Sequence, residues 1–166
     1  AELFELARLD SQVTPIRVEP FSMAELVQDV VQKFELRARQ GSVTLEAELG
    51  RDLPLVMGDI ALMERVLENL IENAIRYTPA GGRVRVSLVP DDGRLAVRVS
   101  DTGAGIEEAS LPHIFDRFWR GDDAASRGSG AGLGLAIAKR ILEMHGTTLN
   151  AESRVNVGTT FAFRLA

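Results

Sequence analysis

The chain has 166 residues, of which 45% are hydrophobic and 26% are charged, and its formal net charge is -5 at pH 7. This length and apolar content suit one domain with a hydrophobic core, and the acidic balance argues against the broad basic surface of a nucleic-acid-binding protein. The absence of cysteine excludes disulfides and cysteine zinc sites, and two histidines are too few for a histidine metal cluster. No apolar run approaches the roughly 18 residues that a membrane span needs.

Apolar spacing predicts the first elements. Residues 2–9 carry leucines at helical spacing and enter in mid-pattern, so we expect the end of a helix that belongs to a longer polypeptide. Residues 16–18 alternate like a short strand. Ser22, with Glu25 three positions later, forms a capping-box pattern and predicts a helix that ends near residue 39.

The middle and the end of the chain mix strands with helices. Beyond residue 39, the predicted elements are strands at 43–47 and 55–57, a helix from Asp59 to about Tyr77, strands at 83–89 and 94–101, a helix at 132–145, and strands at 147–152 and 159–165. The turn Pro90-Asp-Asp-Gly93 predicts a β-hairpin, whereas residues 102–130 lack periodicity and are expected to be functional or mobile. This order favours an α+β fold, a sheet layered against helices.

Two asparagines lie one helical turn apart in the helix predicted after Asp59. Asn69, Asn73 and Arg76 are spaced at i, i+4 and i+7, so their side chains point the same way. Because asparagine is a poor helix former, this pair suggests a polar role such as completing the shell of Mg²⁺ with an amide oxygen. Alternatively, both are surface polar residues. The glutamates of this helix fall on another side and are expected to be solvated: Glu64, Glu68 and Glu72.

Asp101 ends the second strand of the predicted hairpin. It shares strand parity with Val97 and Val99, so its carboxylate is expected to point into the interior. A buried carboxylate needs a hydrogen-bond donor, and the amine of an adenine ring is one. The alternative is an Asx turn with Gly103.

A glycine run precedes the helix predicted at 132–145. Its alternating glycines offer free N–H groups and a helix dipole to phosphate oxygens, although flexible linkers are also glycine-rich. The run is not a Walker motif, because no Gly-Lys-Ser/Thr follows it. Three arginines lie around the run, either as phosphate partners or as solvated charges: Arg117, Arg120 and Arg127. Of these, Arg120 is the strongest candidate for a phosphate contact.

Histidines and aromatic residues near this run are expected to be structural. His145 stands at a helix C-terminus, where an imidazolium complements the dipole, and His113 lies in a short helix that begins at a proline. Phe115, Phe118 and Trp119 are expected to plug the core or to anchor a lid rather than to stack on a base.

The order of these motifs resembles the catalytic ATP-binding domain of bacterial sensor histidine kinases, a branch of the GHKL or Bergerat-fold ATPases. Over about residues 16–165, the matching motifs are the N box Asn69-Leu-Ile-Glu-Asn73-Ala-Ile-Arg-Tyr-Thr78, the G1 box Asp101-Thr-Gly-Ala-Gly-Ile106, the F box Phe115-Asp-Arg-Phe-Trp-Arg120, the G2 box 128–135, and the glycine box Gly158-Thr-Thr-Phe161. The resemblance implies a two-layer α/β sandwich, with a mixed, mostly antiparallel sheet packed against three helices and a flexible ATP lid.

The resemblance also implies roles toward Mg·ATP. Asn73 would hold Mg²⁺, while Asn69, Arg76 and Arg120 would serve phosphoryl transfer. Asp101 would accept a hydrogen bond from the adenine amine, with room for the ring at Gly105. The full binding set that it implies is Asn69, Asn73, Arg76, Tyr77, Asp101, Gly103, Gly105, Ile106, Arg120, Gly130, Gly132, Leu133, Gly134, Leu135 and Thr159.

The position of Asn69 separates two reactions within the wider family. In gyrase-like and Hsp90-like relatives, this position typically holds a glutamate that activates water. An amide cannot accept the proton, so the resemblance implies transfer to a histidine rather than hydrolysis. The departures from the usual pattern are Thr102 for asparagine, Arg76 for lysine and Gly146-Thr147 for two glycines.

The resemblance further implies an architecture and partners. Residues 1–12 would end a preceding dimerisation helix, and residues 13–166 would form the catalytic domain. The acceptor histidine would lie on that dimerisation domain, because neither histidine of this chain has the acceptor motif. Expected partners are that domain and a response-regulator receiver domain, without nucleic acid, for a monomeric domain on the cytoplasmic side of a membrane sensor. The alternatives are a non-catalytic nucleotide-binding regulator and an ATP-hydrolysing relative.

Overall fold

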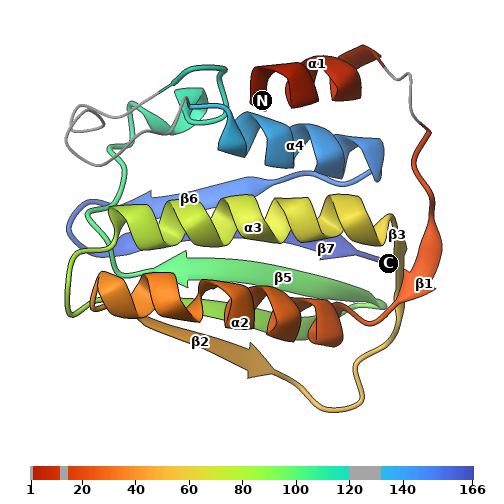
Figure 1. Cartoon of the computed structure of the whole chain (residues 1–166), viewed down its shortest axis with the longest axis horizontal. Helices are drawn as coiled ribbons and strands as arrows, with labels where there is room; N and C mark the ends of the chain where they lie inside the picture. The colour runs from red at the N-terminus through yellow and green to blue at the C-terminus, as the bar shows by residue number, and fades with distance from the viewer. Residues whose placement is uncertain (1, 12–14, 120–131) are drawn as a thin grey trace.

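A computed structural model describes residues 2–11, 15–119 and 132–166. These residues form four α-helices, one short 3₁₀ helix and seven strands (Figure 1). In chain order they are α1 (Glu2–Ser11), β1 (Glu19–Phe21), α2 (Met23–Gln40), β2 (Thr44–Leu49), β3 (Val56–Gly58), α3 (Ile60–Tyr77), β4 (Arg83–Asp91), β5 (Arg94–Asp101), η1 (Leu111–His113), α4 (Gly134–Met144), β6 (Asn150–Arg154) and β7 (Gly158–Leu165). None of the described helices combines the length and apolarity needed to cross a membrane.

The strands form a mixed five-stranded sheet and a small two-stranded one. The larger sheet has the order β2-β4-β5-β7-β6, in which β2 and β4 are parallel and the other neighbours are antiparallel. Helices α2, α3 and α4 cover one face of this sheet, and α1 lies on α4 (Figure 1). The predicted α+β sandwich is confirmed, with α1 as a further helix on the outside of the helical layer.

Local sequence signals explain where the helices begin and end. The Ser22 side chain accepts a hydrogen bond from the N–H of Glu25 (3.2 Å), which confirms the predicted cap of α2. Asp59 caps α3 in the same way through the N–H of Leu62 (3.2 Å). Gly146, with φ of 74°, ends α4 in the left-handed conformation that favours glycine.

The core lies between the sheet and the three helices. Alternate residues of each central strand face the helices, and Leu67, Leu70 and Ile71 of α3 meet them at 0% exposure. The inward rows are Val84, Val86 and Leu88 on β4, Leu95, Val97 and Val99 on β5, and Phe161, Phe163 and Leu165 on β7. Asp101 continues the inward row of β5, so a carboxylate ends an otherwise apolar line.

Most predicted strands agree with the structure to within one or two residues, but two of them differ more. The strand predicted at 16–18 is wrong, because the N–H of Arg17 donates to the Asp59 carboxylate (2.9 Å) and pairing begins at Glu19, opposite Gly58. The last hairpin begins at Asn150 rather than Thr147, since the N–H of Thr147 donates to the Leu142 carbonyl (3.1 Å) and closes α4. In both places a helix cap takes the donor that a strand ladder would need.

His145 is structural, as predicted, but not as an imidazolium. Its Nδ1–H donates to the carbonyl of Ile141 (2.7 Å), and its Nε2 accepts from the backbone N–H of Asp59 (3.0 Å). Because an accepting Nε2 carries no proton, this geometry requires the neutral ring. The histidine therefore ties the C-terminus of α4 to the N-terminus of α3.

Candidate functional site

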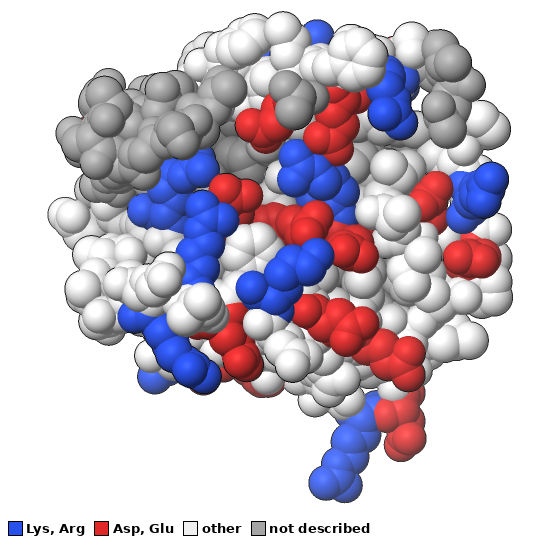
Figure 2. Space-filling view, in the orientation of Figure 1, with Lys and Arg blue, Asp and Glu red and all other residues white. Residues whose placement is uncertain are grey.

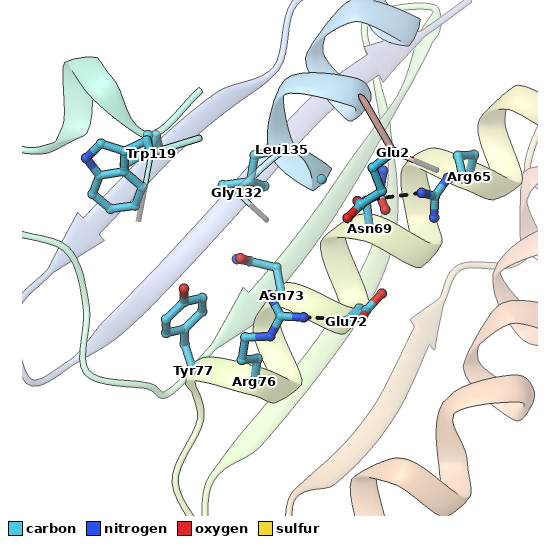
Figure 3. A pocket seen from close by; sticks show the side chains of 12 residues that line it. Glu2, Arg65, Asn69, Glu72, Asn73, Arg76, Tyr77, Trp119, Gly132 and Leu135 are labelled. Carbon is cyan, nitrogen blue, oxygen red and sulfur yellow. Dashed lines mark hydrogen bonds and ion pairs between the residues drawn. The ribbon is translucent and has the colours of Figure 1, made fainter. Parts of the chain in front are cut away.

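A pocket with a volume of about 220 Å³ opens between α3 and the beginning of α4 (Figure 3). Four predicted site residues on α3 meet three predicted residues near the start of α4 around it. The lining residues are Glu2, Arg65, Asn69, Glu72, Asn73, Arg76, Tyr77, Ile114, Trp119, Gly132, Gly134 and Leu135. The packing of α3 against α4 therefore brings the stripe of Asn69, Asn73 and Arg76, called the asparagine stripe below, together with part of the glycine run.

Asn69 has an unsatisfied hydrogen-bond donor in this pocket. The residue is 5% exposed, and its Nδ2 is buried without an acceptor among the residues that the structure describes. A Cβ added at Gly134 would lie 3.7 Å from the Asn69 Oδ1, so the amide lies beside the first residue of α4. Buried donors are normally paired. Asn69 is therefore no surface polar residue, and its amide suits a ligand acceptor.

The beginning of α4 offers backbone N–H groups to the same pocket. Leu133 precedes the helix and provides no side-chain cap, so within the part of the chain that the structure describes, its own side chain leaves the first N–H groups unpaired. The Leu133 side chain is 1% exposed in the core, so only its neighbours Gly132, Gly134 and Leu135 line the pocket. The uncapped helix end and its dipole suit an anion.

Arg76 brings a positive charge to the pocket and shares it with a glutamate. Its Nη2 lies 3.4 Å from the Glu72 Oε1, and the Nη2 of Arg37 from α2 lies 3.3 Å from the same oxygen. Glu72, which was expected on a solvated face, keeps 31% of its side chain exposed but also lines the pocket (Figure 3). Two guanidinium groups hold it, so its negative charge is largely compensated.

Asp101 lies beyond the Tyr77 end of α3 and is 9% exposed. The N–H of Gly103 donates to its Oδ1 (2.9 Å), so the interior carboxylate and the Asx turn are both present. Burial raises the pKa of the Asp101 carboxyl, against the opposing effect of backbone hydrogen bonds from Gly103 and Thr159. A Cβ at Gly103 would lie 2.4 Å from the Tyr77 carbonyl oxygen and 2.9 Å from the Asp101 Oδ1, so the carboxylate lies near the last residue of α3, although Asp101 itself does not line the pocket.

Other predicted residues hold the segment after β5 against the β6–β7 turn. A Cβ at Gly105, where φ is 76°, would lie 2.2 Å from the Arg154 carbonyl oxygen, so close packing requires glycine there. The N–H of Ile106 donates to the Ser153 Oγ (2.7 Å), and this Oγ lies 2.8 Å from the Thr159 Oγ1. These residues do not line the pocket of Figure 3, and their contact with a ligand stays a prediction.

The arginines and aromatic residues predicted near the glycine run do not all lie at the pocket. Arg120 and Gly130 lie outside the described residues, as does Arg127. Arg117 pairs with Asp10 of α1. Phe115 packs edge-on against Phe161 with ring centres 6.2 Å apart, and Trp119 lines the pocket, but Phe118 is 57% exposed. The predicted aromatic plug therefore does not include Phe118.

Residues 58–166, well over half of the chain, match the family described as histidine kinase-, DNA gyrase B-, and HSP90-like ATPases. The chain belongs to this family. It is 38% identical to the sensor histidine kinase AruS of Pseudomonas aeruginosa across 99% of its own length and 17% of that relative. The chain spans well under half the length of the curated relatives that it matches.

Solved structures place the domain more closely within the family. The nucleotide-free catalytic domain of the histidine kinase ThkA matches with a TM-score of 0.79 and 28% identity, over 90% of this chain and 95% of that one. Full-length ShkA in complex with AMPPNP matches with a TM-score of 0.88 and 26% identity, over 99% of this chain and 34% of that one. The chain is a catalytic domain of the sensor histidine kinase type.

Sequence reasoning missed several residues that line the pocket of this histidine kinase domain. Arg65 lies four positions before Asn69 and so continues the stripe of Asn69 and Asn73, a spacing that could have found it. Ile114 adds a buried apolar wall at 2% exposure. Glu2 carries no comparable signal, because its position depends on α1 packing against α4.

Asp101 should make the stability of the domain depend on pH. Its pKa is raised above the ordinary 3.8, so between the two values the folded state holds a proton that the unfolded state has lost. Stability from this group therefore falls as pH rises through that interval and is lowest above the folded-state pKa. We expect the free energy of unfolding of Asp101→Asn to increase relative to that of the wild type as the pH rises above about 4, measured by chemical denaturation at a series of pH values. A difference that does not change with pH would contradict this.

Proposed function

We propose that this domain binds Mg·ATP and donates the γ-phosphoryl group to a histidine on a separate dimerisation domain of its parent chain, for relay to the receiver domain of a response regulator. The observation that carries the proposal is the buried Nδ2 of Asn69, which has no acceptor among the described residues, beside the uncapped beginning of α4. A phosphate group supplies the acceptor that this donor and the helix N–H groups lack.

The residues present fit a magnesium ion that is held mainly by the nucleotide. Asn73 extends from α3 into the pocket (Figure 3), where its amide oxygen is a hard ligand. The described residues contain no group of three or more His, Cys, Asp or Glu side chains that could hold a metal ion. Asn73 would therefore supply one ligand, and phosphate oxygens and water the others. The bound cation would neutralise charge on the phosphates.

Other side chains would orient the nucleotide along α3. Asp101, beyond Tyr77, would accept a hydrogen bond from the adenine amine, and Arg76, the neighbour of Tyr77 on α3, would border the sugar and the phosphates. Ile114 and Trp119 provide apolar surface that excludes water from one side. Arg120 would add a further phosphate contact.

The carboxylates of α3 support phosphoryl transfer over hydrolysis. Glu64 and Glu68 pair with Lys33 of α2, at 3.0 Å and 2.8 Å, on the side away from the pocket. Glu72 is held by Arg37 and Arg76. None of these three carboxylates is thus free to activate water, and the Asn69 amide cannot accept a proton. We propose that the acceptor histidine brings its own base.

The proposal includes the wider architecture. Residues 1–12 would end the preceding dimerisation helix, and residues 13–166 would form a catalytic domain that is monomeric on its own. Leu3 and Phe4 are 53% and 71% exposed on α1, which supports packing of this helix against more of the parent chain. The sensor names of the relatives support a parent that is a membrane sensor with this domain on the cytoplasmic side.

Calorimetry and phosphoryl transfer test the proposal together. We expect the purified chain to bind Mg·ATP, to release little free phosphate, and to label the parent dimerisation domain from γ-labelled ATP. A dimerisation domain with its histidine replaced by glutamine is the control and should stay unlabelled. No binding heat would support a non-catalytic regulator instead, and rapid phosphate release without an acceptor would support an ATP-hydrolysing relative.

A further inference from the structure

Arg65 of α3 is held by two carboxylates of α1. Its Nε lies 2.9 Å from the Glu5 Oε1 and its Nη2 lies 3.0 Å from the Glu5 Oε2, a bidentate pair. The same Nη2 lies 3.8 Å from the Glu2 Oε2. These contacts link the outer helix to the helix that carries the asparagine stripe.

The same cluster lies at one end of the nucleotide pocket. Arg65 and Glu2 both line the pocket, one turn of α3 before Asn69 (Figure 3). From Tyr77, beside Asp101, to Arg65 the helix extends about 18 Å at its usual rise per residue. With adenine at the Asp101 end, as proposed above, Arg65 faces the end of the phosphate chain.

Glu2 reaches the place that suits a phosphate oxygen. A Cβ added at Gly134, the first residue of α4, would lie 3.9 Å from the Glu2 Oε2 and 3.7 Å from the Asn69 Oδ1. A carboxylate therefore shares the uncapped helix end with the unpaired amide of Asn69. Negative charge is already present where the triphosphate would bring more.

We propose that Arg65 selects the triphosphate by binding its terminal phosphate, and that Glu2 and Glu5 of α1 compete with this phosphate for the guanidinium. The inference rests on the proposed function. A guanidinium group can form two parallel hydrogen bonds with either a carboxylate or a phosphate. Here the Glu5 carboxylate accepts from the Nε and Nη2 of Arg65. ATP therefore displaces these glutamates, whereas ADP, one phosphate shorter, leaves them in place.

The structure separates this exchange from the anchoring of α1. Leu6 of α1 is 2% exposed in the core, and Asp10 pairs with Arg117 and with Arg140 of α4. These contacts do not involve Arg65. The glutamates can release the guanidinium while α1 stays on α4.

Calorimetry with Mg·ATP and Mg·ADP tests the inference on the full chain. We expect Arg65→Gln to weaken ATP binding about tenfold and ADP binding less than about twofold. The double variant Glu2→Gln/Glu5→Gln should strengthen ATP binding by about threefold or more, with ADP binding unchanged. The matched control is Lys33→Gln, which breaks another ion-pair cluster on α3, and should alter neither affinity.

The outcomes separate this inference from the proposed function. If the wild-type chain binds ATP but Arg65→Gln changes ATP and ADP affinity equally, or changes neither, the selection by Arg65 is wrong and the nucleotide site stands. If the wild type binds neither nucleotide, the proposed function itself fails. Should Arg65→Gln not fold, the double glutamine variant decides alone, and an unchanged ATP affinity would overturn the competition.

Discussion

Replacing Asp101 with asparagine is expected to weaken ATP binding by about a hundredfold or more without lowering stability at neutral pH. The backbone N–H of Gly103 already donates to the Asp101 Oδ1 (2.9 Å), so an asparagine oxygen would be held there and its NH₂ group would face the ligand. A donor would then meet the amine of adenine, which is also a donor. The substitution also removes the buried negative charge, and with it the cost of burial that raises the pKa of the Asp101 carboxyl in the wild type.

Isothermal titration calorimetry of the isolated chain measures this loss directly. Asp92→Asn is the matched control, because Asp92 lies in the β4–β5 turn, where φ is 51° and asparagine is well tolerated. We expect the control to keep wild-type affinity. An Asp101→Asn variant that binds ATP as tightly as the wild type would show that the adenine end of the site is wrongly assigned.

Replacing Asn73 with alanine is expected to reduce phosphoryl transfer by at least about a hundredfold at saturating ATP. The amide extends into the pocket, and the described residues hold no cluster of carboxylates and histidines that would take over as metal ligands. Without this oxygen, the cation would be placed by the phosphates alone and the terminal phosphoryl group would lose its alignment. Transfer to the dimerisation domain, measured across a magnesium titration, provides the test.

Two further variants identify the cause of such a loss. Asn73→Asp keeps a hard oxygen ligand and should recover part of the activity, with a lower magnesium requirement than the alanine variant. Asn150→Ala, on the exposed strand β6, should behave as wild type. If Asn73→Ala transfers phosphate at the wild-type rate, Asn73 has no part in holding the metal.

Much of the fold follows from local patterns in the sequence. The caps at Ser22 and Asp59, the β4–β5 hairpin and the inward rows of the sheet all appear where apolar spacing and turn residues predict them. Such signals act over a few residues and need no knowledge of distant contacts. The strand predicted at 16–18 is wrong because its donor is used by Asp59, which lies 42 positions away.

The charges on the helical face also depend on contacts between elements. Lysine and arginine side chains alternate there with aspartate and glutamate rather than forming a patch of one sign (Figure 2). Periodicity correctly places Glu64 and Glu68 away from Asn69, but Glu72 turns toward Arg76 and lines the pocket. Helical spacing predicts the side of the helix on which a residue lies, whereas contacts with neighbouring side chains determine its ion-pair partner.

The sequence by itself determined the family resemblance, the two layers and the stripe of Asn69, Asn73 and Arg76, since each depends on residue type at fixed spacing. Only the tertiary structure showed that Asn69 is buried beside Gly134 with an Nδ2 that no described residue accepts from, and that Glu2 and Glu5 hold Arg65. These contacts join α1, α3 and α4, whose relative positions are set by burial of the shared core. Packing of that kind leaves no periodic signal along the chain.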